Sequence, residues 1–258
     1  MKLAIAAIVL CLAAGIVYGG ATVTINGRTI QSAGNSIVIT NDTMVVDGLG
    51  RSGLVIQGSG KSATENRDLN DFTELRLDIS ANVTVTPGDR AKCTITADDN
   101  ILPLILTEHF GKVLRITATE SYSSRQGVKI AIEVPLLTRA QINGSGAISI
   151  VGATAEELAL VINGSGDIHA SGEVTELNAR INGSGNVYAA GLQAKKVVVL
   201  LNGSGDADIH VVNDLTIKVN GSGGVSYGCW IFVPDTEIPC IEGKTIVKRS
   251  DTADLAVH

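Results

Sequence analysis

The clearest pattern in the chain is an alternation of apolar and polar positions that recurs around five copies of the tetrapeptide Asn-Gly-Ser-Gly. The copies begin at Asn143, Asn163, Asn182, Asn202 and Asn220, so they lie 20, 19, 20 and 18 residues apart. In every copy the residue before the asparagine and the residue two positions earlier are apolar, whereas the residue between them varies. The alternation resumes after each tetrapeptide. Because a period of two is the signature of a strand, each repeat is predicted to hold one strand before the tetrapeptide and a second after it.

The regular spacing decides how these strands are expected to pair. Asn-Gly between alternating apolar residues is also a strong hairpin signal, so an antiparallel meander of β-hairpins is the alternative architecture. Identical corners at a fixed period instead favour the stacked rungs of a parallel β-helix. A further loop, such as Ser171-Gly172-Glu173, would complete each repeat, and no room is left for a helix. We predict an all-β chain folded as a right-handed parallel β-helix, a solenoid of short strands with repeated Asn-Gly-Ser-Gly corners.

The tetrapeptide is predicted to be structural. Where a corner recurs in register, a backbone with positive φ and a close neighbour favours glycine, which lacks a Cβ. The asparagine amides can hydrogen-bond to their equivalents in the rungs above and below. The expected corner residues are Asn143, Gly144, Gly146, Asn163, Gly164, Gly166, Asn182, Gly183, Gly185, Asn202, Gly203, Gly205, Asn220, Gly221 and Gly223.

Composition agrees with short strands and narrows the class of partner. Aromatic residues make up only 3% of the 258 residues and glycine contributes 29, so the core must consist of Val, Ile, Leu and Ala between many turns. The formal net charge is −6, and no basic run occurs along the chain. Nucleic-acid binding needs clustered Lys and Arg, so no nucleic-acid partner is expected.

The first 20 residues have the features of a secretory signal peptide. Lys2 is followed by an apolar run and then by small residues at Gly19 and Gly20. The run is too short to span a bilayer comfortably, so the mature chain is expected to have no membrane span and to be extracytoplasmic: secreted, periplasmic or on the cell surface.

Three cysteines remain after such cleavage. Cys93 stands in the alternating stretch "AKCTITA" and is expected to be a buried free thiol. Cys229 and Cys240 bracket a proline-containing segment that a disulfide could close, and an extracytoplasmic compartment permits that bond. A Cys229–Cys240 disulfide is therefore predicted.

Residues that could carry chemistry are sparse. The histidines are not at metal-ligand spacing from one another or from cysteine, and each is expected at a solvated strand or loop position: His109, His169, His210 and His258. The acidic pairs Asp98-Asp99 and Glu156-Glu157 are not expected to converge on one bond, because adjacent strand residues point to opposite faces. Both pairs are expected in solvated turns. An aspartate follows the tetrapeptide only at Asp167 and Asp206, too few for calcium repeats. No catalytic residue, metal or cofactor is expected.

A longer ordered pattern resembles a known family. Phe72 is followed by "LRLDISANVTVTPG", "CTITADDNILPLILTE", "GKVLRI" and then the glycine corners. Over about residues 64–250 this order is similar to the head GIN domain family, described as putative auto-transporter adhesins. The resemblance implies a β-helix and an adhesin-like, extracytoplasmic role, and it brings no catalytic residues.

These observations give the expected organisation of the chain. Residues 1–20 form the signal peptide, 21–63 an N-terminal β leader and 64–250 the GIN-like solenoid. Within the solenoid, residues 138–227 are the regular repeats and 228–250 a C-terminal cap. Residues 251–258 are expected to be a disordered tail.

The function predicted from the sequence is a secreted or surface-exposed, non-enzymatic binding or adhesion module. Its partner would be a protein or another cell-surface component, because a regular solenoid face suits extended contacts. Two alternatives stay open: a structural envelope protein without a small ligand and, more distantly, a carbohydrate-active enzyme on a β-helix.

Overall fold

The computed structural model describes residues 55–228 with their side chains; outside that range only the positions of strands are described. The elements of the described part are β6 (Val55–Gln57), β7 (Ser62–Asp68), β8 (Glu74–Leu77), β9 (Asn82–Pro87), β10 (Lys92–Asp98), the 3-10 helix η2 (Leu102–Leu104), β11 (Ile105–Phe110), β12 (Val113–Ala118), β13 (Ser121–Ser123), β14 (Lys129–Val134), β15 (Arg139–Gly144), β16 (Ala147–Gly164), β17 (Asp167–Gly183), β18 (Val187–Gly203), β19 (Ala207–Gly221) and β20 (Val225–Val233). The other assigned strands are β1 (Gly15–Val17), β2 (Thr22–Ile25), β3 (Arg28–Gln31), β4 (Ile37–Thr40), β5 (Thr43–Val46), β21 (Thr236–Pro239), β22 (Gly243–Thr245) and β23 (Arg249–Val257). Strands account for 72% of residues 55–228, which confirms the all-β prediction.

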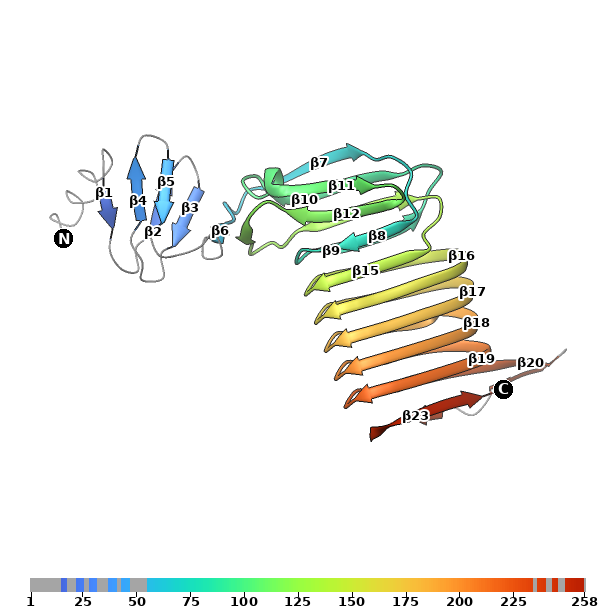
Figure 1. Cartoon of the computed structure of the whole chain (residues 1–258). Helices are drawn as coiled ribbons and strands as arrows, with labels where there is room; N and C mark the ends of the chain where they lie inside the picture. Colours follow the sequence, from blue (N-terminus) through green and yellow to red (C-terminus); the bar gives the residue numbers. More distant parts are fainter. Residues whose placement is uncertain are drawn as a thin grey trace.

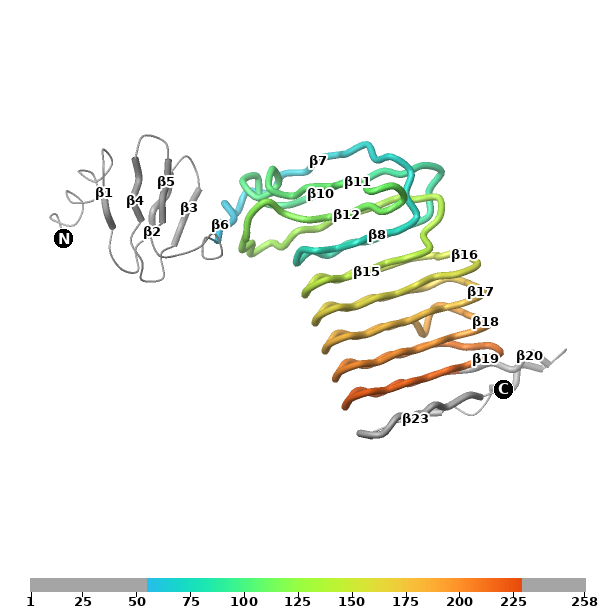
Figure 2. The backbone as a smooth tube through the Cα atoms, viewed as in Figure 1, coloured from blue at the N-terminus to red at the C-terminus, as the bar shows by residue number. Residues whose placement is uncertain are grey.

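The regular part of the fold is a β-solenoid of about four turns. Strands β16 to β19 each run from one Asn-Gly-Ser-Gly corner to the next, and they pair with one another in parallel. In Figure 1 they lie one below another with their arrowheads on the same side. Figure 2 shows the chain coiling through them as a continuous tube. Parallel pairing rules out the alternative of an antiparallel meander for the repeats.

The solenoid interior is made by the apolar residues that precede each corner. The register aligns them in two rows, and every member is at most 2% exposed: Ile142, Ile162, Ile181, Leu201 and Val219 in one row, and Ala140, Leu160, Ala179, Val199 and Ile217 in the other. Full burial of each large aliphatic side chain contributes roughly 1.5–3 kcal/mol. The alternation in the sequence therefore becomes a continuous aliphatic core.

The upstream strands extend the same sheet but join it in a different chain order. On one side of the solenoid β8 pairs in parallel with both β15 and β12, and on another β9 pairs in parallel with β16 and β14. The pairs β7–β10, β10–β14 and β11–β12 are antiparallel. Residues before the repeats thus cover the upper end of the stack with a mixed sheet, visible at the top of Figure 1.

Two local expectations differ from the structure. The loop predicted at Ser171-Gly172-Glu173 is wrong, since these residues lie within the continuous strand β17, where a shift in register provides the bend. A bulge turns a strand without ending its pairing. The tail expected to be disordered at 251–258 is instead assigned, as far as Val257, to β23, which pairs antiparallel with β19. The sequence alternation of Ala253, Leu255 and Val257 favours a strand there.

The other predicted segments meet the structure only in part. The domain boundary expected at residue 64 falls inside β7. Strand β6, which precedes this boundary, already pairs with β13, so residues assigned to the leader take part in the sheets of the described domain. The predicted signal peptide, most of the leader and the Cys229–Cys240 pair lie outside the residues whose side chains are described. Cys93 is free and buried, as predicted.

Candidate functional site

The corner asparagines form one hydrogen-bonded ladder along the solenoid. Each side-chain Nδ2 donates to the Oδ1 of the asparagine one rung earlier, at 2.8–2.9 Å: Asn220 to Asn202, Asn202 to Asn182, Asn182 to Asn163 and Asn163 to Asn143. At the upper end Asn143 donates to Oδ1 of Asp78, at 2.5 Å. The predicted corner asparagines are thus brought together in one row, and a carboxylate ends that row.

Asp78 is held by more than the ladder. Arg76 Nε lies 2.9 Å from Asp78 Oδ1, and Arg115 Nε lies 2.5 Å from Oδ2. Burial alone would raise the pKa of the Asp78 carboxyl, but hydrogen bonds from Asn143, Arg76 and Arg115 outweigh burial and lower this pKa below its ordinary value. Asp78 therefore stays ionised, and two arginines of the upper rungs are occupied by it.

The corner glycines are close-packed for two separate reasons. Gly183 has a φ of +138°, and a Cβ on it would lie 2.2 Å from the carbonyl oxygen of Gly164. Gly185 lacks a positive φ, yet a Cβ there would lie 2.0 Å from the oxygen of Gly166. The same crowding recurs at the corners above and below. From the second corner onward the predicted corner glycines are therefore needed for close packing against the preceding rung, whereas a Cβ at Gly144 would meet open space.

A trough lies beside this ladder on the outer face of the strands that lead into the corners. The register aligns Gln141, Val161, Arg180 and Leu200 in one outward row, and Arg139, Ala159, Asn178 and Val198 in a second row. Strand β16 contributes the small side chains of Ala159 and Val161 between longer ones on β15 and β17. The resulting hollow has a volume of ≈ 410 Å³, and Val161 at its floor is only 8% exposed.

The walls of the trough are polar and carry charge. Arg139 Nη2 donates to Gln141 Oε1 at 3.3 Å, and its Nε is 3.9 Å from Glu74 Oε2. On the opposite wall Asn178 Nδ2 donates to Glu157 Oε1 at 3.0 Å. Arg180 is exposed and makes no hydrogen bond or ion pair to any other residue within 55–228. The trough therefore combines an apolar floor, amide groups and one unpaired guanidinium.

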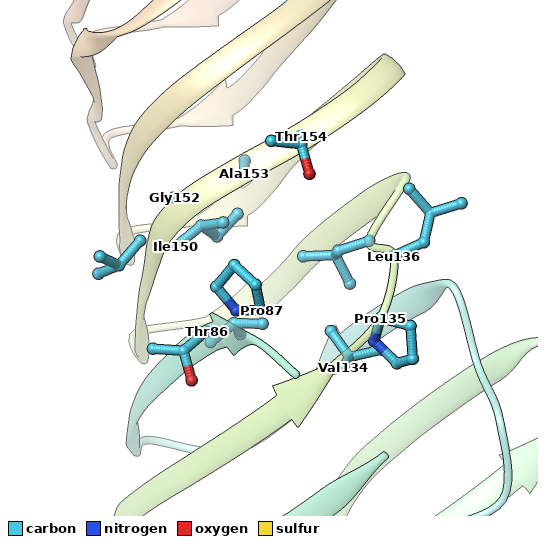
Figure 3. A pocket seen from close by; sticks show the side chains of 12 residues that line it. Thr86, Pro87, Val134, Pro135, Leu136, Ile150, Gly152, Ala153 and Thr154 are labelled. Carbon is cyan, nitrogen blue, oxygen red and sulfur yellow. The ribbon is translucent and has the colours of Figure 1, made fainter. Parts of the chain in front are cut away.

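A second hollow is apolar and much narrower. It lies where the ends of β9 and β14 meet the bulge of β16, and Figure 3 shows Pro87, Leu136 and Ile150 around it. The residues that line it are aliphatic apart from Thr86 and Thr154, and Leu136 is 41% exposed. The notch offers contact area without a charged or catalytic group.

Two expectations about ionisable side chains are wrong. Asp98 is 1% exposed rather than solvated; its carboxylate accepts hydrogen bonds from Gly60 N at 2.8 Å and Ser124 Oγ at 2.5 Å, and so ties three loops together. The ring nitrogens of His109 and Nε2 of His210 are buried without a partner in the described part of the chain. An aspartate exposed in a turn and an aspartate buried by hydrogen bonds to distant loops look alike in the sequence, so no local signal could have shown that Asp98 is buried.

The second outer face, beyond the corners, carries a different chemistry. His169 and Tyr188 are exposed and stacked, with ring centroids 4.6 Å apart and 15° between the ring planes. Asp167 Oδ1 accepts from Asn186 N and Nδ2, and Asp206 Oδ1 accepts from Gly224 N. Among residues 55–228 no group of three or more His, Cys, Asp or Glu side chains is placed to hold a metal ion. Within the same range no helix is long and apolar enough to cross a membrane.

Comparison with known proteins places the chain among adhesin-like domains. The family model described as "Putative auto-transporter adhesin, head GIN domain" matches residues 71–229. A crystal structure of a putative adhesin from Bacteroides fragilis is similar with 23% identity and a TM-score of 0.50, over 67% of this chain and 94% of that one. A putative lipid binding protein from Parabacteroides distasonis is 21% identical over 67% of this chain and 95% of that one, with a TM-score of 0.43. No curated protein sequence matches.

Proposed function

The chain belongs to the family of putative auto-transporter adhesins with a head GIN domain, and on this basis we propose that it is a non-enzymatic binding module that attaches to a cell-surface component. Its site of action is extracytoplasmic, either secreted, periplasmic or at the cell surface. The signal-like residues 1–20 agree with this location. The partner is a protein or another component of a cell surface.

The observation that carries the proposal is the outer face beside the asparagine ladder. Strands β15 to β19 present side chains there at a fixed rung spacing of about 4.8 Å. Solenoids commonly use such extended, rigid surfaces for recognition. Because parallel pairing holds the rungs, the polar groups of the trough are positioned before any partner arrives, which lowers the entropy lost on binding.

The same face supports binding rather than catalysis. Glycoside hydrolysis needs two carboxylates about 5–9 Å apart across one bond. Glu157, which lines the trough, and Glu176 of the next rung both accept a hydrogen bond from Asn178, so these two carboxylates lie side by side rather than across a substrate bond. The acidic pair Glu156-Glu157 is solvent-exposed as predicted, but it lies in strand β16 and not in a turn.

The proposal is tested with the purified full chain on whole cells and on a panel of polysaccharides. We expect saturable retention on cells without release of new reducing ends. The Gly183→Val variant, which should disrupt the stacked corners, serves as the unfolded control. Release of reducing ends would identify an enzyme instead, and neither retention nor release would favour a structural envelope protein.

A further inference from the structure

We propose that the trough over Ala159 and Val161 binds an acidic polysaccharide, and that Arg180 holds one of its carboxylates. This inference rests on the proposed function, because it names the class of surface component that the module recognises. The trough volume of ≈ 410 Å³ is within the range of small-molecule sites, so it accommodates a short segment of a polysaccharide chain.

Arg180 is the group that points to an anion. In the register it lies directly across from Val161, at the edge of the apolar floor. Other arginines of this face are engaged: Arg76 and Arg115 bind Asp78, and Arg139 contacts Glu74 and Gln141. Arg180 has no such partner within residues 55–228. A guanidinium offers five N–H donors in a planar fork that matches a carboxylate, so an external carboxylate would complete its hydrogen bonding.

The charges around the trough place the anion at Arg180. Arg139, roughly 12 Å away across the trough, already lies 3.9 Å from Glu74 Oε2. Two carboxylates lie beside the trough: Glu157 and Glu176 both accept a hydrogen bond from Asn178 Nδ2, at 3.0 and 3.3 Å. Asn178 is two residues before Arg180, about 7 Å along the strand, so salt weakens but does not abolish their repulsion of an anion at Arg180.

The lining favours a polysaccharide over an acidic peptide. A peptide that binds by strand addition needs an unpaired sheet edge, but β15 to β18 are already paired on both sides. A peptide anchored by large side chains needs a deep pocket, whereas Ala159 and Val161 form a shallow floor. Sugar rings present hydroxyls and C–H groups together, and these complement the amides of Gln141 and Asn178 above an apolar floor.

The test measures binding of the full chain to three polymers: polygalacturonate, which is an acidic polysaccharide, neutral dextran and polyglutamate. We expect binding to polygalacturonate that weakens as salt is raised, and no binding to dextran. Arg180→Gln should weaken polygalacturonate binding about tenfold or more, since a charge-assisted bidentate contact is lost. The matched control is Lys195→Gln, which removes one positive charge from an exposed position of β18 that does not line the trough.

Three results would overturn the inference. Equal weakening by Arg180→Gln and Lys195→Gln would show a diffuse charge effect, and unchanged binding by Arg180→Gln would place the site elsewhere. Binding of polyglutamate alone would assign the trough to acidic peptides. Both variants should melt at the temperature of the parent chain, since each residue is exposed.

The outcome is separable from that of the proposed function. If the chain is retained on cells equally well with Arg180→Gln, adhesion stands and this site is wrong. If polygalacturonate binding depends on Arg180 but cells do not retain the chain, the site stands and the adhesion proposal falls.

Discussion

Alanine substitutions at three corner glycines can separate the two physical reasons for glycine in the tetrapeptide. Gly144 has a φ of +128°, but nothing lies within 4 Å of a Cβ built on it. Gly185 lacks a positive φ, but its Cβ would lie 2.0 Å from the oxygen of Gly166. Gly183 combines both features, with a φ of +138° and a Cβ 2.2 Å from the oxygen of Gly164. The three sites therefore isolate backbone strain, steric crowding and their sum.

The magnitudes follow from these contacts. Holding alanine at positive φ costs about 1–3 kcal/mol, which is the whole effect expected for Gly144→Ala. Crowding without strain costs about 1–3 kcal/mol for Gly185→Ala. At Gly183 the displaced carbonyl of Gly164 also accepts hydrogen bonds from Ser184 N at 2.9 Å and Gly185 N at 3.2 Å. Gly183→Ala should therefore cost roughly 3–6 kcal/mol.

Thermal unfolding of the full chain, followed by far-UV circular dichroism, is the assay. A loss of 1 kcal/mol lowers the melting temperature by about 2–4 °C in a chain of this size. Gly183→Ala should therefore melt at a measurably lower temperature than Gly144→Ala and Gly185→Ala. Arg180→Val is the control, because its exposed strand position has neither strain nor crowding. If Gly183→Ala melts at the same temperature as Gly144→Ala or higher, the steric argument is refuted, because both variants share the backbone strain.

Three further predictions concern the ladder, its acidic end and the cysteines. Asn182→Ala should lower the free energy of unfolding by about 0.5–1.5 kcal/mol, measured by urea unfolding, because it removes two part-exposed ladder hydrogen bonds; an unchanged midpoint would contradict the ladder's role. Hydrogen bonds lower the pKa of Asp78, so the ionised Asp78 should stabilise the fold fully above the unfolded pKa of about 3.9, and this stability should be lost as the pH falls through the lower folded pKa. Urea midpoints measured from pH 6 to 2 should show this loss in the parent chain and not in Asp78→Asn. Matching pH profiles of the two proteins would refute the prediction. Burial raises the pKa of the Cys93 thiol to about 11, so native Cys93 should resist alkylation at pH 8, and rapid labelling would refute this claim. Non-reducing peptide mapping should recover Cys229 and Cys240 as one disulfide-linked pair, and two free thiols would refute that claim.

The repeats could be predicted because their information is local and periodic. The apolar positions around Asn163 and Asn182 set the inward face, and the identical tetrapeptides set the register between rungs. The upstream region gave no such help. Alternation predicts a strand but not its direction, so the parallel pairing of β8 with β15 and the antiparallel pairing of β7 with β10 could not be distinguished in advance.

The trough was beyond sequence reasoning for a related reason. The outward row reads only as a mixed set, and its meaning depends on which residues are neighbours across rungs. Val161 becomes a floor because Gln141 and Arg180 flank it in the register. Likewise, Asp98 is buried because segments 26 and 38 residues away converge on it. Such long-range closure leaves no trace in the residues next to Asp98.

The asparagine ladder also has a polarity. Every amide donates toward the N-terminal rungs, so the side-chain dipoles add up, and the positive end of the row points at Asp78. This is the side-chain counterpart of an anion at the N-terminus of a helix, where aligned peptide dipoles favour negative charge. Because hydrogen bonds in a chain polarise one another, each added rung strengthens the interaction at the fixed end. The solenoid can therefore vary in length by whole repeats at its C-terminal end, while the end of the asparagine ladder that meets Asp78 stays in the upper rungs.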